Sequence, residues 1–174
     1  MLRELKNKDA SMMAEALNDA SVNRYMNIGE KATSVETCID FINNSNKDEH
    51  NKHFAIADEN DSWVGTISLK NIDLKVGQAE YAIITATCVH GKGYAYQATM
   101  ELLNYAFNEL KLNRVYLNVV DQNERANKFY NKCGFSLEGT FRNSILVKGQ
   151  VYNLNWYSLL REDFERQVAS GKHI

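Results

Sequence analysis

The sequence contains no proline, no block of like charges and no long apolar run. Its 20 Lys and Arg against 22 Asp and Glu give a formal net charge of −2, so the basic face that nucleic-acid binding requires is not expected. No apolar run approaches the roughly 18 residues of a transmembrane helix, and the N-terminal MLRELKNKDA lacks a signal-peptide core. These absences predict a cytoplasmic protein with neither a nucleic acid nor a membrane as a partner. The absence of proline has no functional explanation.

Cysteine and histidine are also sparse. The cysteines Cys38, Cys88 and Cys133 are odd in number and lack Cys-x-x-Cys spacing, which favours reduced thiols over a disulfide framework or a zinc site. The four histidines are scattered, so no metal is expected. A chain of 174 residues fits one domain, residues 1–174, which should bury roughly 70% of its unfolded surface.

Hydrophobic periodicity predicts one continuous α/β pattern without repeats or linkers. The helix at 95–111 has the clearest apolar stripe, and the strand at 114–121 is apolar on both faces, as in a central strand. Thr33 and Glu36 fit a capping box. The expected order is a strand at 2–6, helices at 10–17 and 33–44, strands at 53–57, 62–70 and 78–89, a helix at 95–111, a strand at 114–121, a helix at 123–133, and strands at 135–147 and 150–160.

The segment HGKGYA, residues 90–95, lies between an apolar strand and the helix at 95–111. Gly91 and Gly93 let backbone N–H groups converge, and the helix start adds unpaired donors and the positive end of its dipole. Such a turn suits a phosphate or diphosphate. The segment is shorter than a Walker loop and lacks the third glycine of the dinucleotide fingerprint, so an ordinary strand-to-helix turn is the alternative.

A second motif, NERANKFYNKCGF at residues 123–135, follows downstream. Together the two motifs resemble the GNAT superfamily of acetyl-CoA-dependent N-acetyltransferases. The segments AEYAI, GKGYA, NERANKFYNKCGF and LEGTFR look most like its RimJ/RimL-type branch. The resemblance covers nearly the whole chain, most closely residues 79–164. It implies an α/β (α+β) fold with a mixed, mostly antiparallel sheet of about seven strands, splayed between the fourth and fifth strands and flanked by about four helices.

The resemblance also implies acetyl-CoA as co-substrate and direct transfer of its acetyl group to a primary amine. The pantetheine arm would follow the backbone of Ile83, Ile84 and Thr85. Asn123 would bind its amide and can cap the next helix at the same time, through different atoms. His90 stands where the family has Gln or Arg, although histidine can still donate to phosphate. The diphosphate would bind at His90, Gly91, Lys92, Gly93, Tyr94, Ala95 and Tyr96.

Tyr130 is the candidate general acid, because a phenol with an ordinary pKa near 10 stays protonated at neutral pH. The alternative is an aromatic ring that only packs. Some family members carry a Glu base where this chain has Asn118, which cannot accept a proton. Glu80 matches a base position of other members, and a salt-bridged structural carboxylate is an equal alternative. Glu138 is a weaker candidate.

The family places the amine site at the loop after the first helix and at the final hairpin, which here implicates Tyr25, Met26 and Trp156. Asn118, on the strand at 114–121, is a further candidate for binding the amine. The absence of an acidic cluster there argues against a polyamine acceptor. Two acceptors stay open, a protein N-terminal amine or a small amine such as a nucleotide-linked amino sugar. A non-catalytic acetyl-CoA-binding module is the alternative of another class, and a homodimer is possible in this family.

Overall fold

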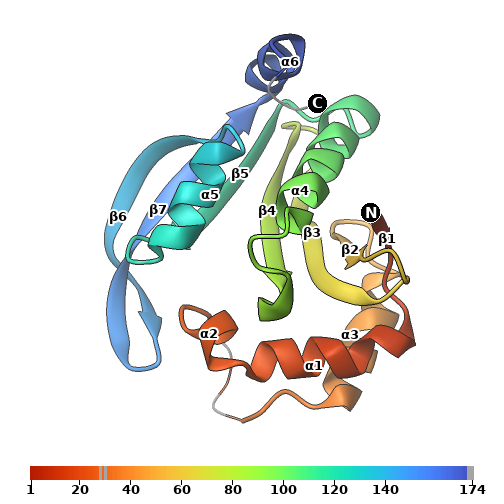
Figure 1. Ribbon diagram of the computed structural model, residues 1–174. Coiled ribbons are helices and arrows are strands. Elements are labelled where there is room, and N and C mark those ends of the chain that lie inside the picture. The colour runs from red at the N-terminus through yellow and green to blue at the C-terminus, as the bar shows by residue number, and fades with distance from the viewer. Residues whose placement is uncertain (28, 30, 172–174) are drawn as a thin grey trace.

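A seven-stranded sheet in the order β1-β2-β3-β4-β5-β7-β6 forms the centre of the protein. The computed structural model describes residues 1–27, 29 and 31–171 (Figure 1). The strands are β1 (Leu2–Glu4), β2 (Lys52–Ala57), β3 (Trp63–Asp73), β4 (Gln78–Thr85), β5 (Arg114–Val120), β6 (Ser136–Val147) and β7 (Gln150–Leu160). The α-helices are α1 (Ala10–Asn18), α2 (Ala20–Asn23), α3 (Val35–Ser45), α4 (Tyr94–Asn104), α5 (Glu124–Lys132) and α6 (Arg161–Ala169).

Only the central strands β4 and β5 run parallel. Their pairing covers three registered pairs, Gln78↔Arg114, Ala79↔Val115 and Glu80↔Tyr116, and ends there. Beyond these pairs the two strands diverge, as Figure 1 shows below α4 and α5. The predicted mixed sheet, splayed between its fourth and fifth strands, is therefore confirmed.

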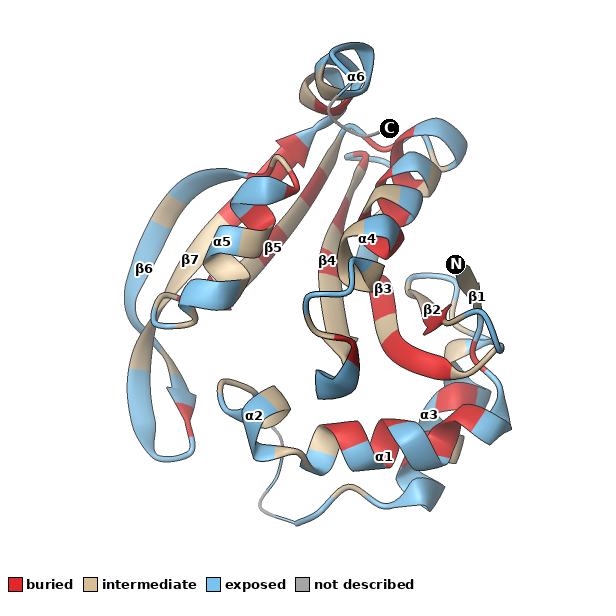
Figure 2. Ribbon diagram, in the orientation of Figure 1, coloured by how far each residue is buried: buried red, intermediate tan, exposed pale blue. Residues whose placement is uncertain are grey.

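The helices α4 and α5 cover the same face of the sheet (Figure 1). Their inward side chains join strand residues in the main core, which Figure 2 shows as buried positions along β3, β4, β5 and α4. Tyr81 of β4 illustrates the contact, since its hydroxyl lies 2.7 Å from Oγ1 of Thr99 on α4 and its ring meets Tyr130 of α5. A second cluster packs α1 and α3 against β2 and β3 through Met13, Ile42 and Trp63.

Several expected boundaries are wrong. The strand expected at 78–89 ends at Thr85, because residues Thr87–Val89 form the 3₁₀ turn η2. The helix expected at 95–111 is α4 followed by a π-helical turn, η3 (Tyr105–Glu109), in which Leu110 N donates to Tyr105 O. The capping box of Thr33 is also wrong. Ser34 is the N-cap of α3, and its Oγ accepts from Thr37 N at 3.1 Å.

The chain also forms two helices beyond the four expected ones. α2 is a short helix whose N-cap, Asp19, accepts from Ser21 N. α6 follows β7 and buries Phe164, which packs on Phe107. The other expected elements lie within a few residues of their predicted bounds.

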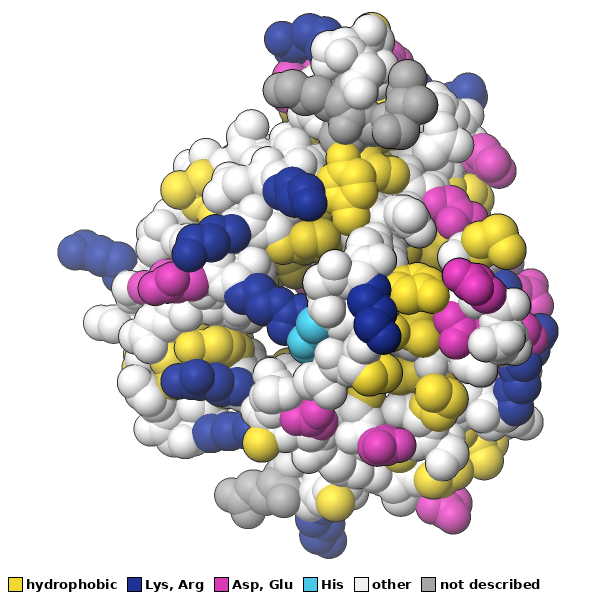
Figure 3. All heavy atoms as spheres, in the orientation of Figure 1, with side chains coloured by type: hydrophobic (Ala, Val, Ile, Leu, Met, Phe, Trp, Pro, Cys, Tyr) yellow, Lys and Arg dark blue, Asp and Glu magenta, His cyan; other side chains and the backbone are white. Residues whose placement is uncertain are grey.

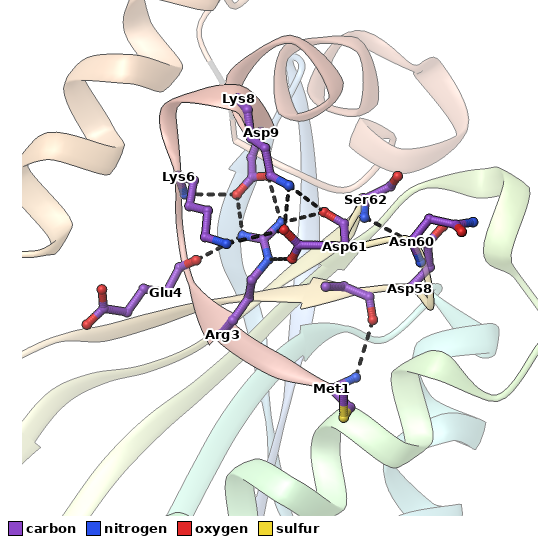
Figure 4. A network of polar contacts seen from close by, with 11 residues as sticks. Met1, Arg3, Glu4, Lys6, Lys8, Asp9, Asp58, Asn60, Asp61 and Ser62 are labelled. Carbon is purple, nitrogen blue, oxygen red and sulfur yellow. Dashed lines mark hydrogen bonds and ion pairs between the residues drawn. The ribbon is translucent and has the colours of Figure 1, made fainter.

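An ion-pair network anchors the N-terminal strand (Figure 4). Arg3 donates to both carboxylate oxygens of the buried Asp9 at 2.8 Å, and Lys6 N donates to Asp9 at 2.9 Å. Asp61, in the turn between β2 and β3, pairs with Arg3, Lys6 and Lys8. The network thus ties β1 and the start of α1 to the β2–β3 hairpin.

Candidate active site

Two adjoining cavities occupy the region where β4 and β5 diverge. The first, the gap cavity, has a volume of about 430 Å³ and lies between the ends of β4 and β5, the start of α5 and α2. The second, the loop cavity, has a volume of about 320 Å³ and lies between the 91–93 loop, α4 and α5. They share Thr85, His90, Ala95, Arg125 and Phe129. Figure 3 shows this face hollowed beside Lys and Arg side chains.

Most residues expected to bind acetyl-CoA lie in these cavities. Ile83, Ile84 and Thr85 line the gap cavity, as does Asn123. Gly91, Gly93 and Tyr96 line the loop cavity, and His90 and Ala95 line both. Lys92 and Tyr94 belong to neither lining.

The glycine loop has the backbone that its sequence predicted. Gly91 and Gly93 have φ of 79° and 88°, a region that favours glycine. Gly93 is the N-cap of α4 and supplies no side-chain cap. The first turn of α4 therefore keeps backbone donors that an anion can accept.

His90 and Arg125 meet between the two cavities. The guanidinium Nη1 of Arg125 lies 2.7 Å from His90 Nδ1. Arginine can only donate, so Nδ1 is the acceptor and the imidazole is neutral. Desolvation lowers the pKa of His90, and the charge of Arg125 lowers it further.

Tyr130 projects from α5 toward the gap cavity. It is 9% exposed and packs against Tyr81, Phe129, Phe135 and Tyr157. Its hydroxyl makes no hydrogen bond to any residue that the structure describes, and the residue lines the cavity. Burial raises the pKa of Tyr130 above its ordinary value, so the phenol stays protonated.

Asn123 is the N-cap of α5, because its Oδ1 accepts from Ala126 N at 3.3 Å. The α5 helix ends, as expected, before Gly134, whose φ is 90°. Asn123 also lines the gap cavity. Its amide nitrogen can therefore serve a ligand while its oxygen caps the helix.

Glu80, Asn118 and Trp156 lie on the sheet face opposite α4 and α5. The register pairs Glu80 with Tyr116 and Asn118 with Trp156, and the rings of Tyr116 and Trp156 stack. Asn118 lines the gap cavity, whereas Glu80 and Trp156 do not.

The carboxylates on this sheet face are ion-paired. Glu80 accepts from Lys70 at 3.1 Å and from Asn71 at 2.9 Å, which matches the alternative of a structural carboxylate. Glu138 is bound by Arg114 and Ser158 and also lies outside the cavity.

The far end of the gap cavity is formed by α2 and the final hairpin. Tyr25 and Met26 line it with Arg24, and Ile145 and Leu154 face them from β6 and β7. The Tyr25 hydroxyl donates to Gln122 O at 3.2 Å, which ties this segment to the start of α5. Among the described residues no Asp or Glu lines the gap cavity.

Four residues of α5 are part of the cavities although the sequence did not single them out. Arg125, Lys128, Phe129 and Lys132 line the loop cavity. Their spacing of three, four and seven residues places them on one helical face, and this periodicity is the signal that could have found them.

The part of the chain that the structure describes holds no group of three or more His, Cys, Asp or Glu side chains placed to bind a metal. None of its helices is long and apolar enough to cross a membrane. Cys38, Cys88 and Cys133 are all free thiols, and burial raises the pKa of Cys133 to about 12.

Residues 1–136 match the acetyltransferase (GNAT) domain family. The chain is 30% identical to the uncharacterized N-acetyltransferase p20 of Bacillus licheniformis, over 94% of this chain and 93% of that protein. It is 31% identical to the spermidine N(1)-acetyltransferase of Escherichia coli K12, over 87% of this chain and 81% of that enzyme. The crystal structure of the Vibrio cholerae spermidine N-acetyltransferase with CoA and spermine superimposes with a TM-score of 0.85 at 25% identity, covering 95% of this chain and 97% of that one.

Proposed function

This chain belongs to the GNAT acetyltransferase family and is an acetyl-CoA-dependent N-acetyltransferase, and we propose that its acceptor is the primary amine of a small molecule with no second positive charge. One observation carries this proposal. The gap cavity joins the open edge of β4, the hydroxyl-bearing Tyr130 and the α2 segment in one space that no carboxylate lines among the described residues. We also propose that residues 1–174 form one domain, because a single sheet takes strands from both the N-terminal and the C-terminal part of the chain.

We propose that the pantetheine arm lies along Ile83, Ile84 and Thr85, where β4 is no longer paired with β5. Backbone groups at such an edge can bind an extended ligand as a neighbouring strand would. The diphosphate then reaches the loop at residues 90–96, and Asn123 contacts the arm from the opposite side. This placement directs the thioester toward Tyr130.

In the proposed reaction a neutral amine attacks the thioester carbonyl carbon. A C–N bond forms, the C–S bond breaks, and Tyr130 donates its proton to the departing sulfur. The amine loses one proton and the thiol gains one, so the phenolate of Tyr130 is reprotonated from solvent. Burial raises the pKa of Tyr130, so the hydroxyl carries its proton at neutral pH before the reaction begins.

The amine must also lose a proton, and this step needs a base. Glu80 was the candidate base, but it is bound to Lys70 and Asn71 and lies outside the gap cavity. Asn118, on the same sheet face, does reach the cavity. We therefore propose that water near Asn118 takes the proton, with Glu80 in a structural role.

The acceptor class follows from charge. Arg24 and Arg125 line the gap cavity together with the neutral His90, and none of the described lining residues is a carboxylate. A polyamine would therefore bring several positive charges to a cavity that already holds these guanidinium groups. The spermidine acetyltransferases among the relatives support a small amine as acceptor in this fold. An amino sugar is a small amine without a second positive charge, so it fits this cavity better than spermidine or a protein N-terminus. The segments AEYAI and LEGTFR support the RimJ/RimL-type branch.

The test is thiol release from acetyl-CoA with matched amines: an amino sugar, its phosphorylated form, a short peptide with a free N-terminus, and spermidine. We expect the amino sugars to give the highest kcat/KM. Spermidine as the best substrate would overturn the acceptor class. Tight acetyl-CoA binding with no release for any amine would instead favour the non-catalytic module.

A further inference from the structure

We infer that Arg125 binds the diphosphate of acetyl-CoA from the α5 side of the groove, opposite the 91–93 loop, and that His90 positions it. The inference rests on the proposed placement of acetyl-CoA. It adds a side chain to a subsite that the sequence assigned to the loop alone.

The location of Arg125 carries the first part of the argument. Among the described residues it is the only Lys or Arg that lines both cavities. A ligand that runs from the glycine loop to Tyr130 must pass the residues that the cavities share. The diphosphate is the part of acetyl-CoA that lies beside Gly91 and Gly93 in this placement, so Arg125 faces it across the groove.

The partners of Arg125 carry the second part. Its guanidinium forms no ion pair within the described residues, and its side-chain hydrogen bond goes to the neutral His90. One of its five N–H donors is thereby used, which leaves donors and the full charge for an anion. Arginine matches phosphate oxygens with a rigid fork of donors. An uncompensated guanidinium beside a glycine loop is thus suited to a diphosphate.

The nearby lysines differ from Arg125 in their contacts. Lys128 pairs with Glu124 at 3.4 Å, and Lys132 Nζ lies 5.2 Å from the ring centroid of Tyr96. Both line the loop cavity only. Neither lysine therefore lines the gap cavity, which Tyr130 lines.

His90 acts as a positioning residue. It stands where the family has Gln or Arg, so the loop itself supplies no permanent side-chain cation at that point. Its Nδ1 instead accepts from Arg125 and holds the guanidinium at the junction of the two cavities. The positive charge at this junction is therefore the guanidinium of Arg125 on α5.

Acetyl-CoA and S-acetylpantetheine, used as alternative acetyl donors, separate binding of the diphosphate by Arg125 from any other role of this residue. We expect Arg125→Ala to raise the Kd for CoA and the KM for acetyl-CoA about tenfold or more, the cost of a lost charged hydrogen bond. The kcat/KM for S-acetylpantetheine, which lacks the diphosphate, should stay within about twofold by the same reasoning. Arg166→Ala is the matched control, because Arg166 pairs with Asp163 on α6 and lines neither cavity.

The role of His90 is tested by a double-mutant cycle on CoA affinity. His90→Ala should weaken CoA binding in the parent and add little in Arg125→Ala, whereas His90→Asn, which keeps an acceptor, should restore part of the loss. Equal losses with both thioesters, or an unchanged CoA affinity in Arg125→Ala, would overturn the inference. CoA binding is measured without an amine, so this outcome is independent of the acceptor proposal.

Discussion

At the scale of single residues, Tyr130 combines a packed ring with an uncommitted hydroxyl. Tyr130→Phe keeps the ring contacts with Tyr81 and Phe135 and removes only the hydroxyl. We expect stability to change by about 1 kcal/mol or less, since that hydroxyl makes no hydrogen bond among the described residues. Turnover should fall at least about 10²-fold, the lower range of general-acid catalysis.

The measurement combines turnover, CoA affinity and melting temperature on one preparation. Tyr81→Phe is the matched control, because it removes a hydroxyl that bonds Thr99 inside the core. It should lower the melting temperature more than Tyr130→Phe and turnover less. Turnover of Tyr130→Phe within a few fold of the parent would mean that the thiolate leaves unassisted.

Glu80 gives a second prediction at this scale. The Glu80 carboxylate accepts hydrogen bonds from Lys70 and Asn71. The loss of turnover in Glu80→Gln should therefore be much smaller than the roughly 10²-fold loss expected on removing a general base. The readout is the pH dependence of turnover. A large loss at neutral pH that is recovered at high pH, where the amine is already neutral, would identify Glu80 as the base.

At the scale of secondary-structure elements, Gly93 has a φ of 88° and is the N-cap at which α4 begins. Gly93→Ala should reduce the stabilisation by acetyl-CoA, since an L-residue resists this backbone and shifts the loop. Gly149→Ala is the control, because Gly149 has a φ of 80° in the β6–β7 turn and lines neither cavity. Both variants should lose similar intrinsic stability. Only Gly93→Ala should show a smaller rise in melting temperature with added acetyl-CoA than the parent, and equal rises in both variants would contradict this loop assignment.

Elements with a strong period were predictable from the sequence, and short or strained ones were not. The apolar stripe of α4 and the two-sided apolar pattern of β5 predicted both elements, because burial imposes the period, although α4 ends at Asn104 and not at residue 111. α2 has four residues and buries none, so it leaves no periodic signal. β4 appeared too long because the apolar Val89 that follows it belongs to a 3₁₀ turn with its own buried contact.

The candidate site shows the same division. Residues in spaced motifs, such as Gly93, Asn123 and Tyr130, could be found from the sequence and are brought together in the cavities. The pairing of His90 with Arg125 could not, because it joins residues 35 positions apart. Such a contact depends on how α5 packs beside the loop before α4, and this packing cannot be predicted from the spacing of residues in the sequence.

At the scale of the whole molecule, the sheet is open at its centre and secured at its N-terminal edge. The β4–β5 pairing is limited to three registered pairs, so the groove depends on the two halves of the sheet being held by their own packing. The Arg3–Asp9–Asp61 network secures the first half by joining β1 and α1 to the β2–β3 turn (Figure 4). Its loss should therefore reduce stability without changing the groups in the cavities.

Asp9→Asn tests this separation. The Asp9 side chain is 1% exposed and pairs with Arg3, and breaking a buried pair costs about 3 kcal/mol, or about 6–12 °C in Tm for a chain of this size. Asp163→Asn, which breaks the Arg166 pair on the surface, should cost less than about 1 kcal/mol. CoA affinity at a temperature well below both transitions should match the parent in both variants.

The stability contributed by the Asp9–Arg3 pair should depend on pH. Burial raises the pKa of Asp9, but hydrogen bonds from Arg3 and the Lys6 amide outweigh it, so the pKa lies below its ordinary value. The stability that the carboxylate contributes is complete above its unfolded pKa of about 4 and is lost as the pH falls through the lower folded pKa. The Tm difference between the parent and Asp9→Asn should therefore be constant near neutral pH and shrink below about pH 4. A difference that stays constant into acid would show that Asp9 contributes through packing and not through its charge.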